Sequence, residues 1–154
     1  MDNWRLINRG GKLVFFLTCL LLAVLSTGCW SAKEDAAKLE EVNAVWTRLP
    51  IYPGMQDVGD VTRSGGGNVL VSKKFRSDAR YDDVKRFYIE RLAQDGWQVT
   101  SDRKLASSVG GPAGDYIQFQ KGDLFVSIEH AADGDNRDWD YAIAASWSRW
   151  IKKK

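Results

Sequence analysis

An apolar run near the start of the chain most restricts what the chain can fold into. Residues 13–25, LVFFLTCLLLAVL, contain no charged residue, and Thr18 is their only hydroxyl side chain. A basic stretch precedes the run at residues 1–12, and the small residues 26–28 follow it. A basic region, an apolar core and a small-residue site are the three parts of a secretory signal. The sequence therefore predicts that residues 1–28 are a signal peptide outside the folded domain.

An uncleaved membrane anchor is the alternative interpretation of the same run. The apolar core at residues 13–25 is shorter than the ~18 apolar residues expected of a spanning helix. Extending the run to Trp30 reaches about that length only by including Ser26, Thr27 and Gly28. Length therefore favours the cleaved signal. In both cases the rest of the chain is exported.

The formal net charge of the chain comes from this leader. The whole sequence contains 22 Lys and Arg residues and 20 Asp and Glu residues. Leaving out Arg5, Arg9, Lys12 and Asp2 leaves 19 of each, so residues 29–154 carry no net charge. A neutral domain lacks the basic footprint of nucleic-acid-binding proteins, and we expect no nucleic-acid partner.

The two cysteines have different expected fates. Cys19 lies inside the apolar core and leaves with the signal, so Cys29 is the only thiol of the mature chain and cannot form an intramolecular disulfide. The residues before Cys29 resemble the lipobox of bacterial lipoproteins, in which Leu and two small residues precede the modified Cys. Thr27 and Gly28 fill the two small positions. Ser26 departs from the pattern, because it stands where that family has Leu.

The resemblance to lipoproteins implies a role for Cys29. In that family the Cys becomes the first mature residue and carries thioether-linked diacylglycerol, often with a further acyl chain such as palmitate on its amine. Stable anchoring needs about two chains, at ~0.8 kcal/mol for each buried methylene. The resemblance therefore implies a membrane partner through the lipid on Cys29, at the extracytoplasmic face of a bacterial envelope. Trp30, in place of the Asp that often retains lipoproteins at the inner membrane, implies the outer membrane in a cell that has two.

An amphipathic helix is expected over residues 32–48. Ser31 and Glu34 have the spacing of a capping box, and Pro50 ends the helical pattern. Apolar residues recur at three- and four-residue steps along one helical face: Ala36, Leu39, Val42, Trp46 and Leu49. This face either packs on the domain or lies close to lipid headgroups, with Trp30 at the interface.

Residues 51–68 are expected to form a turn and a loop. Pro53-Gly54 is a turn signal, and the three glycines at 65–67 predict a flexible hairpin loop. A phosphate-binding loop is disfavoured because the Lys-Ser/Thr pair of a P-loop is missing after these glycines.

The remaining segments alternate in the manner of an α+β fold. Residues 68–75 predict a strand with Val69, Val71 and Phe75 on one side. Residues 81–96 predict a helix that Asp78 caps and Gly96 ends, with the buried stripe Tyr81, Val84, Phe87, Tyr88 and Leu92. Strands are then expected at 97–101, 115–120, 123–130 and 139–147, with a hairpin turn at Lys121-Gly122 and with Trp139, Tyr141, Ile143, Ala145 and Trp147 on one face of the last strand.

The predicted fold class is α+β. An N-terminal amphipathic helix precedes a β-α-β-β-β antiparallel sheet with the helix packed on one face, and the alternation over 139–147 extends that sheet. The predicted organisation is a signal peptide at 1–28, a lipidated Cys with an amphipathic helix at 29–49, and a single α+β domain at 50–154. The segments YPGM and VKRFYIERLAQDGW resemble a pattern in small, largely uncharacterised exported bacterial proteins, in which such a helix crosses an antiparallel sheet.

The sequence offers little catalytic chemistry. His130 is the only histidine, so with Cys29 as the only mature thiol the common zinc sites cannot be assembled, and neither a metal nor a cofactor is expected. The sequence therefore favours a non-catalytic, lipid-anchored binding or assembly module whose partner is an envelope protein or polymer. Candidate binding residues are Trp150 and the terminal basic residues Lys152, Lys153 and Lys154, which either contact anionic headgroups or form a solvated tail.

An envelope hydrolase is the alternative function. Asp138 and Asp140 lie at alternating positions near His130, as an acid–base pair on one strand face would. The same spacing also suits a solvated strand edge. No nucleophile motif accompanies these residues.

Overall fold

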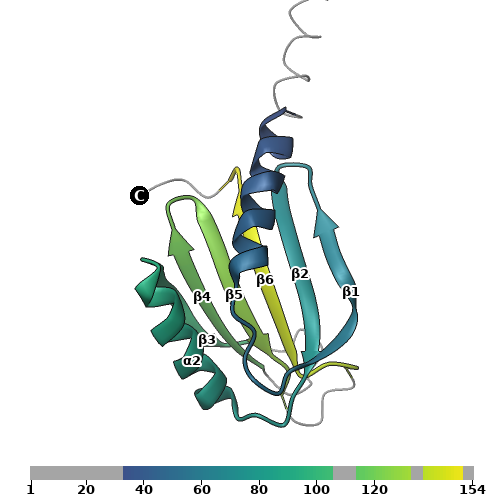
Figure 1. Cartoon of the computed structure of the whole chain (residues 1–154), viewed down its shortest axis with the longest axis vertical. Helices are drawn as coiled ribbons and strands as arrows, with labels where there is room; N and C mark the ends of the chain where they lie inside the picture. The colour runs from purple at the N-terminus through teal and green to yellow at the C-terminus, as the bar shows by residue number, and fades with distance from the viewer. Residues whose placement is uncertain (1–32, 106–113, 133–136, 151–154) are drawn as a thin grey trace, which may run out of the picture.

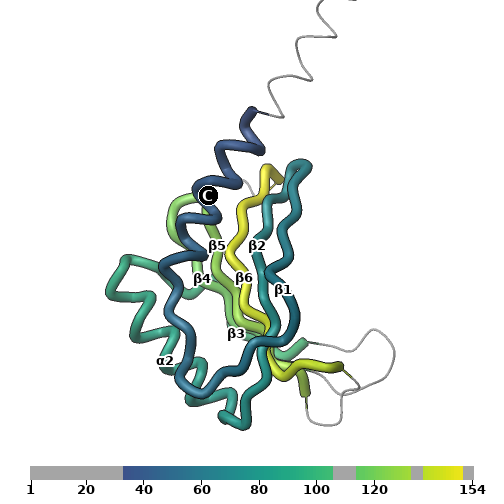
Figure 2. Tube along the Cα trace, turned by 45° about the vertical axis from the view of Figure 1, so that its right-hand side comes forward, coloured from purple at the N-terminus to yellow at the C-terminus, as the bar shows by residue number. Residues whose placement is uncertain are grey.

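In the part of the chain that the structure describes, six strands form one sheet, and every pairing between neighbouring strands is antiparallel. The computed structural model describes residues 33–105, 114–132 and 137–150. Within these residues two helices lie on the same side of the sheet (Figures 1 and 2). The predictions of an α+β class and an antiparallel sheet are confirmed.

The last strand along the chain lies inside the sheet, because the strand order is β1-β2-β6-β5-β4-β3. The strands are β1 (Gln56–Ser64), β2 (Asn68–Arg76), β3 (Gln98–Lys104), β4 (Asp115–Lys121), β5 (Leu124–His130) and β6 (Tyr141–Ser148). Helix α2 (Tyr81–Gln94) connects β2 to β3. The N-terminal helix is described over residues 33–48.

One face of the sheet is apolar because the register aligns alternate residues of neighbouring strands. Ile143 of β6 pairs with Ile128 of β5, which pairs in turn with Ile117 of β4. Ala145, which is two residues further along β6 and on the same face, pairs with Val71 of β2. All five side chains are fully buried. This face therefore supplies the floor of the core on which the helices pack.

Each helix covers a different part of this face. From α2, Val84, Tyr88 and Leu92 pack over the part that includes β4, β5 and β6. From the N-terminal helix, Val42 is fully buried against residues of β2 and β6. The buried residues under α2 and those around Val42 form two core clusters. Four partly buried side chains contact both clusters and join them into one core: Val45, Trp46, Leu49 and Leu124. Of the predicted helical stripe, Ala36 is instead exposed.

The prediction for residues 51–68 misses β1, which occupies half of that segment, although the predicted turn at Pro53-Gly54 is present. The residues of β1 are largely exposed, and a register shift between Val58 and Thr62 breaks the alternation that marks a strand. Only Val61 of this strand packs against the core. The order along the described chain is consequently β-β-α-β-β-β-β after the N-terminal helix, and not β-α-β-β-β. The predicted hairpin loop at 65–67 does connect β1 to β2.

Two further details differ from the sequence prediction. Asp78 does not cap α2: the N-cap residue is Arg80, and no side chain bonds to the first helical amides there. Trp139 does not lie on the strand face with Tyr141, because β6 begins only at Tyr141. The Trp139 ring is buried, and the cationic groups of Lys74 and Arg137 lie 5.7 and 4.7 Å from its centroid. Cation–π contacts thus hold this indole outside the two core clusters.

Close backbone packing at Gly114 gives a first prediction. A Cβ atom at this position would lie 2.3 Å from the carbonyl oxygen of His130, so Gly114→Ala forces β4 and β5 apart where they begin to pair. We expect the free energy of unfolding in urea to fall by about 1–3 kcal/mol. Gly65→Ala is the matched control, because a Cβ at that position meets nothing within 4 Å. Equal stability of the two variants would contradict the prediction.

Candidate functional site

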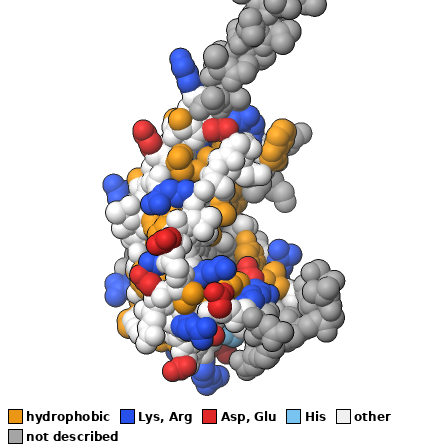
Figure 3. All heavy atoms as spheres, turned by 90° about the vertical axis from the view of Figure 1, so that its right-hand side faces the viewer, with side chains coloured by type: hydrophobic (Ala, Val, Ile, Leu, Met, Phe, Trp, Pro, Cys, Tyr) orange, Lys and Arg blue, Asp and Glu red, His pale blue; other side chains and the backbone are white. Residues whose placement is uncertain are grey.

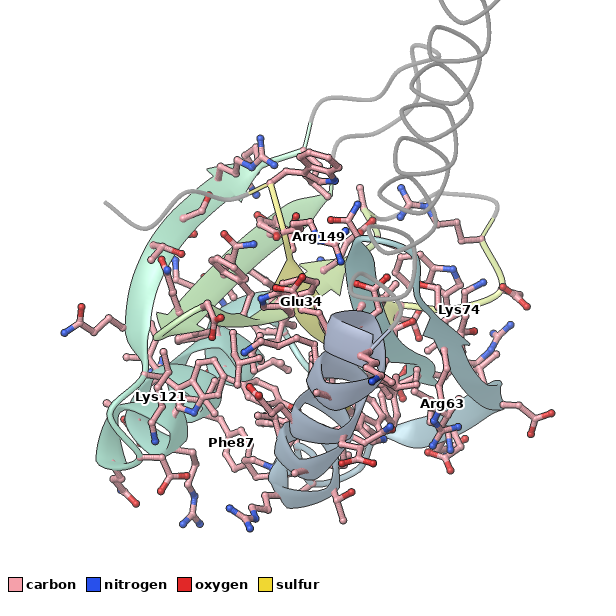
Figure 4. All side chains as sticks on the ribbon, turned by 90° about the horizontal axis from the view of Figure 1, so that it is seen from above. Glu34, Arg63, Lys74, Phe87, Lys121 and Arg149 are labelled. Atoms are coloured by element: carbon pink, nitrogen blue, oxygen red, sulfur yellow. The ribbon has the colours of Figure 1, made fainter. Side chains whose placement is uncertain are left out.

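The start of the N-terminal helix is tied to the end of β6 by a set of residues that we call the Arg149 cluster: Glu34, Asp35, Gly67 and Arg149. The Arg149 guanidinium lies 2.7 Å from the Asp35 carboxylate and 3.2 Å from that of Glu34. The Gly67 amide donates to Asp35 at 3.1 Å, and the Arg149 amide donates to the Gly67 carbonyl at 2.9 Å. Figure 4 shows Glu34 and Arg149 together near the helix. The cluster therefore fixes the helix start, the β1–β2 hairpin and the end of β6 at one end of the molecule.

A second link holds the N-terminal helix to the β4–β5 hairpin. Lys38 lies 3.1 Å from the Asp123 carboxylate, which also accepts a hydrogen bond from the Trp147 indole at 3.2 Å. A hydrogen bond to Glu41 is the main cause of the raised pKa of Lys38. Burial acts to raise the pKa of Asp123, but the hydrogen bond and charge of Lys38 outweigh it, and that pKa is lowered. The link is thus strongest above the pKa of Asp123 and is lost as pH falls through it.

Trp150 lies at the same end. Its side chain is 74% exposed, and its amide lies 3.3 Å from the Ser148 hydroxyl. The indole nitrogen is 3.6 Å from the place where a Cβ on Gly67 would lie, so the ring lies beside the β1–β2 hairpin. The other predicted site residues, Cys29 and Lys152 to Lys154, are outside the described residues.

His130 lies at the opposite end of the sheet, beside a cavity of about 500 Å³. Its imidazole is stacked on Tyr81, with ring centroids 5.6 Å apart, and lies 4.7 Å from the ring of Tyr141. Its Nδ1 atom is 3.6 Å from the Asp115 carboxylate. Burial raises the pKa of both tyrosines, and the Tyr141 hydroxyl donates to the carbonyl of Ala79 at 2.7 Å. The histidine is therefore packed between rings at the rim of the core.

The structure brings together only part of the predicted hydrolase pair. His130 and Asp140 both line the cavity, but Asp138 does not. An Asp140 carboxylate oxygen accepts the Ser77 amide at 2.9 Å, which gives that side chain a structural partner. The Asp138 carboxylate is 72% exposed and lies 4.0 Å from Lys74. Both aspartates precede β6, so the premise that they alternate on a strand face is wrong.

The described residues offer neither a membrane-spanning helix nor a metal-binding cluster. No helix among them is both long and apolar enough to cross a bilayer. Within the same residues no group of three or more His, Cys, Asp or Glu side chains is placed to hold a metal ion. On the side of the molecule in Figure 3, acidic and basic side chains are interspersed.

The Arg149 cluster is the part of the site that sequence reasoning missed. Glu34 is predicted only as a helix cap, and the Asp35–Arg149 pair spans 114 residues, so no local pattern marks it. No protein-family model, no curated protein and no solved structure matches the chain.

Removing one carboxylate tests the Arg149 cluster. Asp35→Ala deletes the closest partner of the guanidinium and the acceptor of the Gly67 amide. We expect a loss of roughly 1–2 kcal/mol in unfolding free energy and faster amide exchange in residues 33–48. Glu40→Ala is the control, because Glu40 is exposed on the same helix. Equal exchange in the two variants would show that the cluster does not hold the helix.

Proposed function

We propose that this protein is a lipid-anchored, non-catalytic binding or assembly module on the extracytoplasmic face of a bacterial envelope. The proposal rests first on the resemblance of the residues before Cys29 to a lipobox. The lipid on Cys29 holds the module at the membrane, which is the outer membrane where the cell has two. Its further partner is an envelope protein or polymer.

The observation that carries the proposal is that the start of the N-terminal helix and the end of β6 meet at the Arg149 cluster. Cys29 is four residues before Lys33, so an extended chain keeps it within ~14 Å of the helix start. Lys152 follows Trp150 by two residues and stays within ~7 Å of it. The lipid, the exposed indole and the terminal lysines therefore belong to one end of the molecule, which supports an orientation with that end toward the bilayer.

This orientation gives Trp150 and the terminal lysines a role at the membrane surface. An indole suits the interface because it combines an apolar ring with a hydrogen-bond donor. Each of Lys152, Lys153 and Lys154 contributes ~1 kcal/mol near an anionic leaflet. These contacts orient the domain, while the acyl chains supply the anchoring itself.

The experiment that tests the proposal is mass spectrometry of the N-terminal peptide of the protein taken from its native membrane. The expected peptide begins at Cys29 and carries the mass of diacylglycerol, with or without an amide-linked acyl chain. A peptide that begins upstream of Cys29, or an unmodified thiol, would overturn the anchoring. Chemical crosslinking in intact cells tests the binding role, which requires the capture of an envelope protein or polymer.

The shared cavity of His130 and Asp140 is the observation that keeps a hydrolase as the second candidate. In this alternative His130 exchanges the proton and Asp140 acts as its carboxylate partner. Combining His130→Gln with Asp140→Asn should then abolish an envelope phenotype that the wild-type gene restores. Full restoration by the double variant would eliminate the hydrolase, and the binding module predicts that outcome.

A further inference from the structure

A groove of about 510 Å³ separates the two helices above the sheet. The C-terminal half of the N-terminal helix forms one wall and the end of α2 forms the other, while the β4–β5 hairpin closes one side. Figure 1 shows that the two helices lie apart at this level, with β4 and β5 behind them. Its volume is within the range of ~300–1,000 Å³ typical of small-ligand sites.

The floor and walls of the groove are apolar. Val45 and Leu49 come from the N-terminal helix, Leu92 from α2, Trp97 from the segment after α2, and Leu124 from β5. Leu92 is 1% and Trp97 8% exposed, so these side chains seal the floor. A long unbranched hydrocarbon fits such a lining, because it gains ~0.8 kcal/mol for each methylene that leaves water. The lining alone does not define the other end of the ligand.

The charged residues at the rim of the groove indicate which group the ligand carries at its polar end. Arg48 lines the groove at the end of the N-terminal helix, and it forms no ion pair with another described residue. Lys121 lies across the groove on the α2 side, where it donates one hydrogen bond to the Asp95 carbonyl at 2.6 Å (Figure 4). Two of its three N–H donors remain for a ligand. The Glu41 carboxylate lies 2.8 Å from Lys38, which it shares with Asp123, so Arg48 and Lys121 are the groups of the groove lining with N–H donors left for an anion.

We propose that this groove binds a single-chain amphiphile with an anionic head, of the fatty-acid class. The hydrocarbon lies along Val45, Leu49, Leu92 and Leu124, and the carboxylate is bound by Arg48 with Lys121 as the second donor. The ligand is taken up from the aqueous phase beside the membrane, because a chain already in the bilayer gains nothing from burial in protein. The inference concerns a site separate from the Arg149 cluster and does not require the lipid on Cys29.

Photochemical labelling of the full chain in phosphatidylcholine nanodiscs tests the proposal. The probe is dodecanoic acid that carries a diazirine on its chain, and the labelled peptides are mapped by mass spectrometry after digestion. We expect label to concentrate in three segments, which are residues 45–50, 92–97 and 121–124. Label spread evenly over the surface, or absent from these segments, would overturn the proposal.

A pair of matched variants distinguishes binding of the probe in the groove from nonspecific binding to the protein surface. Ala44 is exposed and lines the groove, so Ala44→Phe fills it without replacing a core side chain. We expect labelling of the three groove segments to be about tenfold lower in this variant. Ala36→Phe adds the same ring at an exposed position of the same helix that does not line the groove. Equal label in both variants, with unchanged thermal unfolding, would place the probe elsewhere.

Comparing a charged probe with an uncharged one tests whether the ligand needs an anionic head. Arg48→Gln removes the charge at the rim and is expected to reduce labelling by the acid about threefold. Labelling by the corresponding diazirine alcohol, which has the same chain and no charge, should be weaker and unaffected by the substitution. Equal labelling by acid and alcohol would remove the anionic head from the proposal. Because the anchor is tested separately at Cys29, failure here is distinguishable from failure of the membrane attachment.

Discussion

Replacing Cys29 with Ser is expected to abolish incorporation of radiolabelled palmitate and to release the protein from the membrane fraction. A serine hydroxyl cannot form the thioether that carries diacylglycerol, so both chains of that group are lost together. At ~0.8 kcal/mol per buried methylene, two acyl chains account for nearly all of the membrane affinity. What remains is Trp150 and three terminal lysines, at ~1 kcal/mol for each lysine near an anionic surface. The lysine contribution to this remaining binding should weaken when the salt concentration is raised, because it is electrostatic.

The chain supplies its own control for this experiment. Cys19 is the only other cysteine, and it lies in the apolar core of the predicted signal. Cys19→Ser should therefore leave palmitate incorporation and membrane retention unchanged. Label that survives in Cys29→Ser, or label lost in Cys19→Ser, would exclude Cys29 as the anchor. Retention of unlabelled Cys29→Ser protein in the membrane after a high-salt wash would instead support the uncleaved anchor at residues 13–25.

The elements that follow from the sequence are those with a strong periodic burial pattern. Helix α2 has its buried residues Val84, Tyr88 and Leu92 at four-residue steps, and β2 has Val69 and Val71 at alternate positions. A glycine after the helix has φ +81°, a conformation that ends helices cleanly. In such segments the local pattern and the tertiary contacts demand the same geometry, so the prediction succeeds.

The elements that escaped prediction are fixed by contacts distant in sequence. β1 is an edge strand whose side chains are mostly exposed, so neither face has the apolar alternation that marks a buried strand. Trp139 has the pattern of a core residue on a strand, yet its ring contacts the cationic group of Lys74, which is 65 residues away in the sequence. The Arg149 cluster likewise depends on β6 ending beside the helix start, which follows from the strand order and not from local sequence. The ends of the molecule could therefore not be assigned before the topology was known.

Val42→Asp is expected to detach the N-terminal helix from the sheet. Val42 is fully buried against Val69, Val71, Ala145 and Trp147. The first three side chains are aliphatic, and the indole N–H of Trp147 already donates to Asp123. Burying an unpaired carboxylate there costs more free energy than packing the helix on the sheet contributes. We therefore expect a loss of at least about 3 kcal/mol in unfolding free energy. Val42→Ala, which only leaves a small cavity, should cost about 1–2 kcal/mol. Urea unfolding of both variants gives the two values.

Hydrogen exchange distinguishes detachment of the helix from collapse of the whole fold. Val42 packs with buried residues of β2 and β6, whereas α2 packs with buried residues that include those of β4 and β5. The residues under α2 can therefore keep their protection when the contacts of Val42 open. Ala36→Asp, on an exposed position of the same helix, should leave exchange unchanged. If Val42→Asp exchanged no faster than this control, the helix would not depend on its buried face. Rapid exchange confined to residues 33–48 would show instead that packing on the sheet holds this helix rigidly on the domain. Under the proposed anchoring, such packing would limit how far the domain can move from the bilayer.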